Sequence, residues 1–264
     1  MKKAMLMIVL MIFAVFFLLL LTSCISNSPS KSEPNVLLSS RKSFLQIRTF
    51  ALIKICKKDS CEENSKHLSS GSGFVVAIDK NGSYILTAAH VCENVGYESF
   101  KISVEEKNKK FSASIKFFGR TVNYDRHELH VVKADRDLDL CIMYSPGLKS
   151  IPIPIARRTI LPGAKIYNIA APLDIMHKNA PVMVDGFYSG RDPESGADVF
   201  TMIVDNGSSG SPIMNDRGEV IGIVSMKNIH FEFLAYSPPL ELIRYFVFNV
   251  LHAYSPEPII GFQR

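Results

Sequence analysis

Three short segments carry side chains that could act together on a carbonyl group. His90 follows one apolar run, Asp139 directly precedes another, and Ser209 lies in the glycine-rich segment 205–212, DNGSSGSP. A serine hydroxyl becomes a nucleophile when an imidazole takes its proton, and a carboxylate can hold that imidazole in the right orientation. These residue types therefore indicate acyl-transfer chemistry at one shared site.

The residues around Ser209 suggest how a negative charge on the reacting oxygen could be held. Small neighbours such as Gly207 and Gly210 allow a tight backbone turn, and successive N–H groups inside such a turn can bind an oxyanion. Taken alone, this segment could equally be a surface loop, and the acids at 135, 137 and 139 could equally be exposed turn residues. The catalytic interpretation depends on all three segments occurring together.

The elements that must position these residues are mostly strands. Short runs rich in β-branched and aromatic residues alternate with turn-forming residues, which is typical of an all-β sandwich or barrel. We predict strands at 44–56, 71–78, 83–89, 100–106, 111–118, 129–134, 138–145, 164–170, 182–190, 198–204, 219–226 and 231–236. A single helix is expected in 238–254, with Leu240, Ile243, Phe246, Val247 and Val250 on one face.

The N-terminus has the layout of an export signal. Lys2 and Lys3 precede an unbroken apolar run from 4 to 21, and small polar residues follow. Residues 21–24, LTSC, resemble the bacterial lipobox, so we expect a lipoprotein signal peptide at 1–23 and lipidation of Cys24. The alternative is an uncleaved membrane anchor, because 18 apolar residues are near the lower limit for a span. Both readings place the remaining chain outside the cytoplasm, on the periplasmic side or at the cell surface, tied to a membrane.

The rest of the chain divides into a tether, one domain and a tail. Residues 24–43 are rich in Ser, Asn and Pro, so we expect a flexible tether, followed by a domain at 44–252 and a tail at 253–264. The net charge of +5 is dispersed among acidic residues, so no face for nucleic acid is expected. Nothing in this pattern indicates an oligomeric state.

Four cysteines remain after Cys24, an even number for an oxidising compartment. Cys56 and Cys61 flank a turn-like tetrapeptide, where they either close a small hairpin or stay as two thiols. His67 lies nearby, but no fourth ligand is apparent for zinc. We expect no metal ion and no cofactor.

The sequence resembles the trypsin-like serine peptidases, in particular the bacterial branch that includes HtrA and the glutamyl endopeptidases. The matching segments are GSGFVV, LTAAHV, VVKADRDLDLCIM, GSSGSPIMNDRGEVIGIVS and AYSPPLELI, in that order. The resemblance implies an all-β fold with two six-stranded antiparallel β-barrels, chymotrypsin-like, and a C-terminal helix. It also implies a membrane-tethered serine endopeptidase that acts on proteins or peptides. HtrA relatives usually carry a PDZ domain after the protease, and we expect none here.

The resemblance assigns roles by position. His90 becomes the general base, Asp139 its orienting acid and Ser209 the nucleophile, while the N–H groups of Gly207 and Ser209 form the oxyanion hole. Asp137 is the rival acid, because it lies two residues away on the same predicted strand face. Cys92 and Cys141 each follow a triad residue by two positions, so they are either a disulfide between those segments or two buried thiols.

The substrate pocket and the activation mechanism follow less directly from the resemblance. A mainly apolar wall implies small or medium apolar P1 residues, and its predicted members are Ile203, Val204, Val224, Ser225, Met226 and Lys227. Ser208 stands where digestive enzymes carry the Asp that pairs with a newly freed N-terminus. We therefore expect no activation by proteolysis.

The alternatives to a serine endopeptidase are an inactive peptidase homologue that binds proteins at the cell surface, and an adhesin or structural module.

Overall fold

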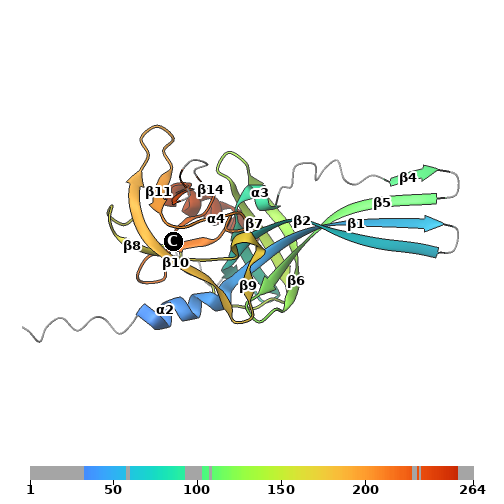
Figure 1. Cartoon of the computed structure of the whole chain (residues 1–264), viewed down its shortest axis with the longest axis horizontal. Helices are drawn as coiled ribbons and strands as arrows, with labels where there is room; N and C mark the ends of the chain where they lie inside the picture. The colour runs from blue at the N-terminus through green and yellow to red at the C-terminus, as the bar shows by residue number, and fades with distance from the viewer. Residues whose placement is uncertain are drawn as a thin grey trace, which may run out of the picture. The chain divides into compact units, whose positions relative to one another are not determined.

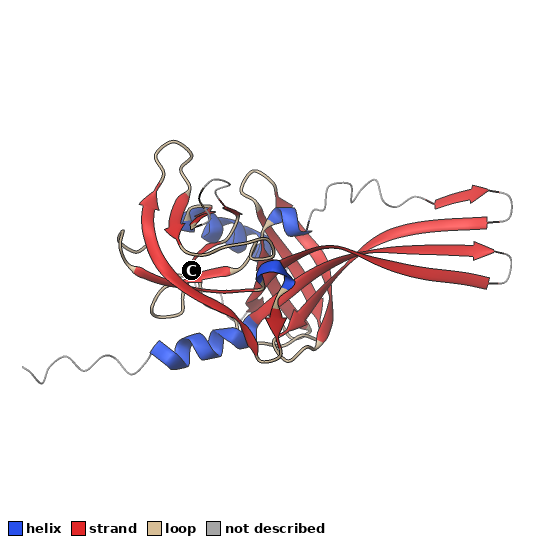
Figure 2. Ribbon diagram, in the orientation of Figure 1, coloured by secondary structure: helices blue, strands red, loops and turns tan. Residues whose placement is uncertain are grey.

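The structure is a computed structural model that describes residues 33–57, 60–92, 103–106, 109–227, 231 and 233–254. Residues from Val36 onward form one compact unit. It is built from two antiparallel sheets and a few helices (Figures 1 and 2). The predicted all-β class is confirmed.

Six of the seven strands of the N-terminal sheet close into a barrel. The strands of the sheet are β1 (Phe44–Lys57), β2 (Ser60–Ile78), β3 (Gly82–Thr87), β4 (Ser103–Glu106), which lies outside the barrel, β5 (Lys109–Thr121), β6 (Arg126–Asp135) and β7 (Leu140–Pro146). The order is β1-β2-β3-β7-β6-β5-β4, and a further pairing of β1 with β5 closes the ring. Beyond the barrel, β1, β2 and β5 continue as a long ribbon to which β4 adds a fourth strand (Figure 1).

The C-terminal sheet is a half-barrel. Its strands are β8 (Lys165–Ala170), β9 (Met176–His177), β10 (Ala180–Arg191), β11 (Asp198–Thr201), β12 (Pro212–Met214), β13 (Val220–Ile223), β14 (Met226–Lys227) and β15 (Leu234–Ser237). They run in the order β13-β12-β8-β10-β11-β15-β14, with β9 beside β10. The closed barrel and this half-barrel together give the predicted chymotrypsin-like arrangement of two antiparallel β units. β13 and β14 belong to one continuous segment that pairs with β12 at its start and with β15 at its end. Between them, Val224 bonds to the loop that carries Ser209.

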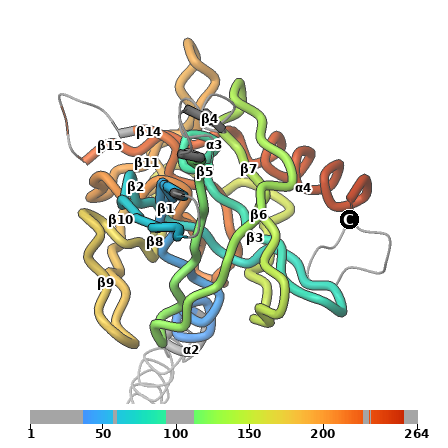
Figure 3. The backbone as a smooth tube through the Cα atoms, turned by 90° about the vertical axis from the view of Figure 1, so that its right-hand side faces the viewer, coloured from blue at the N-terminus to red at the C-terminus, as the bar shows by residue number. Residues whose placement is uncertain are grey.

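The C-terminal helix α4 (Leu240–Tyr254) follows the predicted pattern. The five residues predicted for one face are buried, together with Leu251. Pro239 begins the helix by accepting bonds from the N–H groups of Leu242 and Ile243. The helix packs beside β6 and β7 (Figure 3), so its apolar face completes the core of the N-terminal barrel.

The segment just before the first strand differs from the expected flexible tether. It forms the helix α2 (Glu33–Ser40) and the short 3-10 helix η1 (Arg41–Ser43). Ser43 is buried and donates a hydrogen bond to the carbonyl of Ile151, while Leu37 packs against the barrel core. Residues 24–32 and the apolar run at 4–21 lie outside the described residues, and none of the helices described is long and apolar enough to cross a membrane.

Candidate active site

His90 is presented by a sharp change from strand to helix. β3 is fully buried and ends at Thr87, and after Ala88 the one-turn helix α3 (Ala89–Cys92) begins. Ala89 and Val91 point into the core, so the residue between them faces outward. The side chain of His90 is 51% exposed, which leaves its ring accessible to a substrate.

Asp139 holds the His90 imidazole through one ring nitrogen. Nδ1 of His90 lies 2.9 Å from both carboxylate oxygens, and the His90 backbone N–H donates to Oδ1 at 3.0 Å. Asp139 has a left-handed φ of 50° in the turn that enters β7, a conformation that Asp tolerates better than most residues. Asp137 is exposed in the same turn and makes no hydrogen bond to His90. The geometry thus brings Asp139, and not Asp137, to the imidazole.

Ser225 supplies a second donor to the same carboxylate. Its hydroxyl, 6% exposed with the rest of the residue, donates to Oδ2 of Asp139. Burial acts to raise the pKa of Asp139, but the hydrogen bonds from His90 and Ser225 outweigh it and hold that pKa below its ordinary value. Asp139 therefore stays ionised beside the imidazole. Ser225 was predicted as part of the pocket wall, and besides this contact it lines the cavity that adjoins Asp139.

A disulfide joins the segments that carry His90 and Asp139. Cys92 at the end of α3 is bonded to Cys141 in β7, with their Cα atoms 6.6 Å apart. Cys92 lies two residues after His90, and Cys141 lies two residues after Asp139. The bond therefore limits how far the base and its acid can separate. It settles the choice that the sequence left open between a disulfide and two free thiols.

Ser209 reaches the same place from the C-terminal sheet. Its carbonyl accepts the N–H of Ser72 at 2.8 Å, and a Cβ atom at the adjacent Gly210 would collide with Thr87 and with the carbonyl of Ser72. The Ser209 loop thus packs directly on the residues that precede His90. The side chains of Ser209 and His90 are not hydrogen-bonded to each other, and such catalytic bonds commonly tighten only when substrate binds.

Two N–H groups of this loop lack an acceptor among the described residues. The carbonyl of Asn206 accepts the N–H of Leu173 at 2.6 Å, and the carbonyl of Ser208 accepts that of Ser211 at 3.0 Å. In a planar trans peptide the C=O and N–H point in opposite directions. The N–H groups of Gly207 and Ser209 therefore point away from those partners, and both are available as donors.

The remaining residues of the predicted pocket divide by exposure. Val204 and Val224 are buried, whereas Ile203 and Met226 are 61% and 62% exposed. The side chain of Lys227 lies outside the described residues. A cavity of about 570 Å³ adjoins Asp139 and includes Met226 and Leu242 in its lining. The structure thus provides both a buried apolar surface and an exposed apolar rim.

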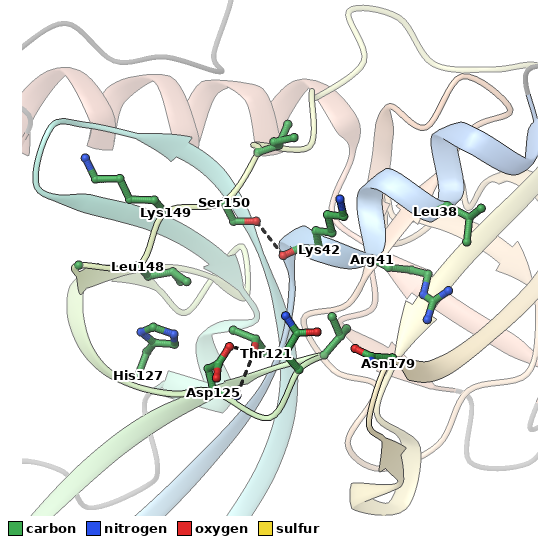
Figure 4. Close-up of a pocket in the computed structure, with 14 residues that line it drawn as sticks. Leu38, Arg41, Lys42, Thr121, Asp125, His127, Leu148, Lys149, Ser150 and Asn179 are labelled. Carbon is green, nitrogen blue, oxygen red and sulfur yellow. Dashed lines mark hydrogen bonds between the residues drawn. The ribbon is translucent and has the colours of Figure 1, made fainter.

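A separate cavity lies on the N-terminal barrel beside η1. It has a volume of about 750 Å³, and Figure 4 shows Arg41, Lys42, His127 and Lys149 among its lining residues. None of the three predicted catalytic residues borders it. This cavity is therefore distinct from the candidate active site.

The other cysteine assignments have different outcomes. Cys56 and Cys61 form a disulfide across the end of the β1–β2 hairpin, with Cα atoms 4.0 Å apart. Cys24 lies outside the described residues. Within the part of the chain that the structure describes, no group of three or more His, Cys, Asp or Glu side chains is arranged to hold a metal ion.

Sequence reasoning missed the residues that support the loop around Ser209. Ser72 is fully buried, donates from Oγ to the carbonyl of Gly207 at 2.7 Å and accepts the N–H of Ala171 at 3.1 Å. Its position between Gly71 and Gly73 was the signal available, because two small neighbours permit close backbone approach. Asp174 and Arg48, which meet beside Leu173, have no comparable motif.

Comparison with known proteins agrees with this geometry. The family model for the trypsin-like peptidase domain matches residues 71–223, more than half of the chain and a range that contains His90, Asp139 and Ser209. The structure is also similar to the crystal structure of the serine endoprotease from Yersinia pestis, with a TM-score of 0.60 and 17% sequence identity. That similarity covers 86% of this chain and 68% of the other, and it supports the chymotrypsin-like fold.

Proposed function

Since this chain belongs to the trypsin-like peptidase family and is a serine endopeptidase, we propose that it cleaves peptide bonds with His90, Asp139 and Ser209 through an acyl-enzyme. The observation that carries this proposal is the contact of Asp139 with Nδ1 of His90 at 2.9 Å. Because that nitrogen is occupied, Nε2 is the ring atom left to act as the base. Asp139 remains ionised and stabilises the imidazolium that forms.

The reaction would proceed in two steps. The Oγ of Ser209 attacks the carbonyl carbon while Nε2 of His90 takes its proton, and the N–H groups of Gly207 and Ser209 bind the oxyanion. His90 then returns the proton to the leaving amine. In the second step, water attacks the acyl-enzyme with the same base and releases Ser209.

The specificity proposed for this site is for small or medium apolar P1 residues. The exposed side chains of Ile203 and Met226 offer apolar surface near the nucleophile loop, and an apolar substrate side chain would gain most by covering that surface. Cleavage of a peptide library followed by mass spectrometry would test it. A preference for Lys, Arg or Glu at P1 would contradict it.

The location proposed is outside the cytoplasm, with a lipid on Cys24 or an uncleaved N-terminal anchor holding the protein at a membrane. Two disulfides within the domain support this location, because disulfides persist mainly in oxidising compartments. Placement in the HtrA branch rests on the matching segments of the sequence. Labelling of cells with an alkyne fatty acid should mark the natural chain and not Cys24→Ser. A natural chain that is found in the membrane fraction but does not take up the label would favour the anchor instead.

The catalytic proposal is tested with a fluorophosphonate probe on the full chain in detergent. We expect a single labelled peptide that contains Ser209, and we expect labelling to disappear in Ser209→Ala and His90→Ala. The matched controls are Ser189→Ala and His177→Ala, which alter exposed residues away from the site. Absence of labelling in folded natural chain would contradict the proposal and favour a homologue that only binds.

A further inference from the structure

We propose that Asp174 and Arg48 are positioning residues that hold the oxyanion hole open by acting through the backbone of Leu173. This inference rests on the proposed catalytic function of Ser209. The uncharged Ser208 cannot anchor the oxyanion hole through an ion pair, and the inference assigns this anchoring to the ion pair of Arg48 and Asp174.

Asp174 is held by three side chains of the N-terminal barrel. Arg48 donates from Nε to Oδ1 at 3.0 Å and from Nη2 to Oδ2, while Gln46 and Ser70 donate to Oδ1 at 2.6 and 2.8 Å. Gln46 and Arg48 belong to β1 and Ser70 to β2, whereas Asp174 ends the 3-10 helix η2 (Pro172–Asp174) that follows β8. The carboxylate therefore fixes a connection of the C-terminal sheet to the wall of the barrel.

This connection has a backbone that requires an anchor. Leu173 and Asp174 have left-handed φ values of 52° and 63°. Asp tolerates this conformation, but it is unfavourable for Leu173. The side chain of Leu173 is 59% exposed, so burial of that side chain contributes little to holding the turn. The hydrogen bonds of Asp174 hold this turn in place.

The strained turn sets the orientation of the oxyanion-hole peptide. The N–H of Leu173 donates to the carbonyl of Asn206 at 2.6 Å. That carbonyl belongs to the same peptide plane as the N–H of Gly207, so the bond to Leu173 forces this N–H to the opposite side. If the turn were released, the peptide could rotate, and one of the two donors for the oxyanion would be lost.

Ser208, the residue before the nucleophile, carries no charge that could replace this anchor, and the charged residue of the loop, Asp205, accepts the N–H of its own neighbour Asn206 at 2.7 Å. Ser208 is 2% exposed, and among the described residues its hydroxyl accepts the N–H of Asp205, at 3.4 Å. Ser72 holds the carbonyl of Gly207, which belongs to the next peptide and not to the peptide that carries the Gly207 N–H. The ion pair of Arg48 and Asp174 thus orients the hole from outside the loop, without a freed N-terminus.

The test measures how fast a fluorophosphonate labels the full chain in detergent, over a range of probe concentrations. In labelling, Ser209 Oγ forms a bond to phosphorus, fluoride leaves, the proton passes to His90, and the phosphoryl oxygen occupies the oxyanion hole. The maximal rate, kinact, depends on the hole, whereas KI reports probe binding. Asp174→Asn and Arg48→Met should each lower kinact by about 10- to 100-fold with KI unchanged. Removal of one oxyanion donor typically costs about 100- to 1,000-fold in rate, so release of the turn should give a loss at or below the lower end of that range.

Three further variants separate positioning from general support of the fold. The double variant should lose no more than either single variant, since both act through one turn. Arg48→Lys should recover part of kinact, because it retains a cation. Asp185→Asn, which breaks the exposed ion pair with Lys165 at 3.1 Å, is the matched control and should label like the natural chain. Thermal unfolding identifies any variant that does not fold, and Ser70→Ala, which removes only one donor, then takes its place with an expected severalfold loss.

The outcomes distinguish this inference from the function on which it rests. Labelling of Ser209 in the natural chain with kinact unchanged, within twofold, in the folded variants would overturn the inference alone. A loss confined to KI would also overturn it. Failure of the natural chain to label at Ser209 would overturn the proposed function and the inference with it.

Discussion

The hydroxyl of Ser225 donates a hydrogen bond to the same carboxylate of Asp139 that holds the His90 imidazole. The residue before Ser225, Val224, bonds to the Ser209 loop: its N–H donates to the carbonyl of Ser211 at 3.0 Å. One short segment therefore contacts both the acid and the nucleophile loop. It couples the two halves of the site, which come from different sheets.

Ser225→Ala should lower kcat about tenfold, since a hydrogen bond to a charged group is worth roughly 1.5 kcal/mol. Loss of this donor also raises the pKa of Asp139 and leaves its carboxylate free to turn away from His90. The measurement is kcat on a peptide substrate, with Ser83→Ala as the control. Ser83 is also buried but bonds to the carbonyl of Leu148, away from the site. Equal activity of the two variants would show that the contact has no catalytic role.

The pH dependence of stability should show the ionised state of Asp139. Its pKa in the folded protein is held below the ordinary value of 3.8 by the bonds from His90 and Ser225. A lowered pKa stabilises the folded state above the unfolded value, and this stabilisation is lost as the pH falls through the folded value. In urea unfolding, the difference in the free energy of unfolding between the natural chain and Asp139→Asn should therefore be present at pH 6 and become smaller below about pH 4. A difference in the free energy of unfolding that stays constant down to pH 2 would contradict this.

The two disulfides should contribute unequally to stability. Cys92 and Cys141 are 49 residues apart in the sequence, whereas Cys56 and Cys61 are 5 apart. Loop-closure entropy gives about 4 kcal/mol for the longer loop and about 2 kcal/mol for the shorter one. The double variants Cys92→Ala/Cys141→Ala and Cys56→Ala/Cys61→Ala can be compared by urea unfolding. Only the first should also slow labelling of Ser209, because only that bond ties His90 to Asp139.

Local sequence was enough to predict most strands and the C-terminal helix, but not the short strands β9 and β12. The alternation of apolar runs with turns located most strands, and the apolar face of α4 was predicted residue by residue. The early part of β2 was missed, because residues 60–68 are exposed on the ribbon and carry no apolar pattern. The closing pair of β1 and β5 joins Leu45 to Thr121, and no local signal reports such a distant register.

The candidate site shows the same division. His90, Asp139 and Ser209 stand beside distinctive short motifs, so their types and order could be seen in the sequence. The supporting contacts could not, because they depend on residues that are far apart and chemically ordinary. Arg48 meets Asp174 across 126 positions, and Ser72 meets Gly207 across 135. Only the packing of the two sheets brings such pairs together.

Ser72 provides the strongest test of whether the N-terminal barrel shapes the nucleophile loop. Replacing its buried hydroxyl in Ser72→Ala leaves the carbonyl of Gly207 and the N–H of Ala171 without their partner, which should lower the free energy of unfolding by about 2 kcal/mol. The fluorophosphonate labelling rate should fall as well, because the Gly207 carbonyl is then free to move.

Ser83→Ala again serves as the control, since it removes a buried hydroxyl that also donates to a backbone carbonyl. Its stability should fall by a similar amount, but its labelling rate should remain that of the natural chain. If both variants lose stability and neither loses labelling, Ser72 supports the fold alone, and the loop around Ser209 keeps its shape without that bond. If only Ser72→Ala loses labelling, the barrel wall is part of what prepares the nucleophile loop for the oxyanion.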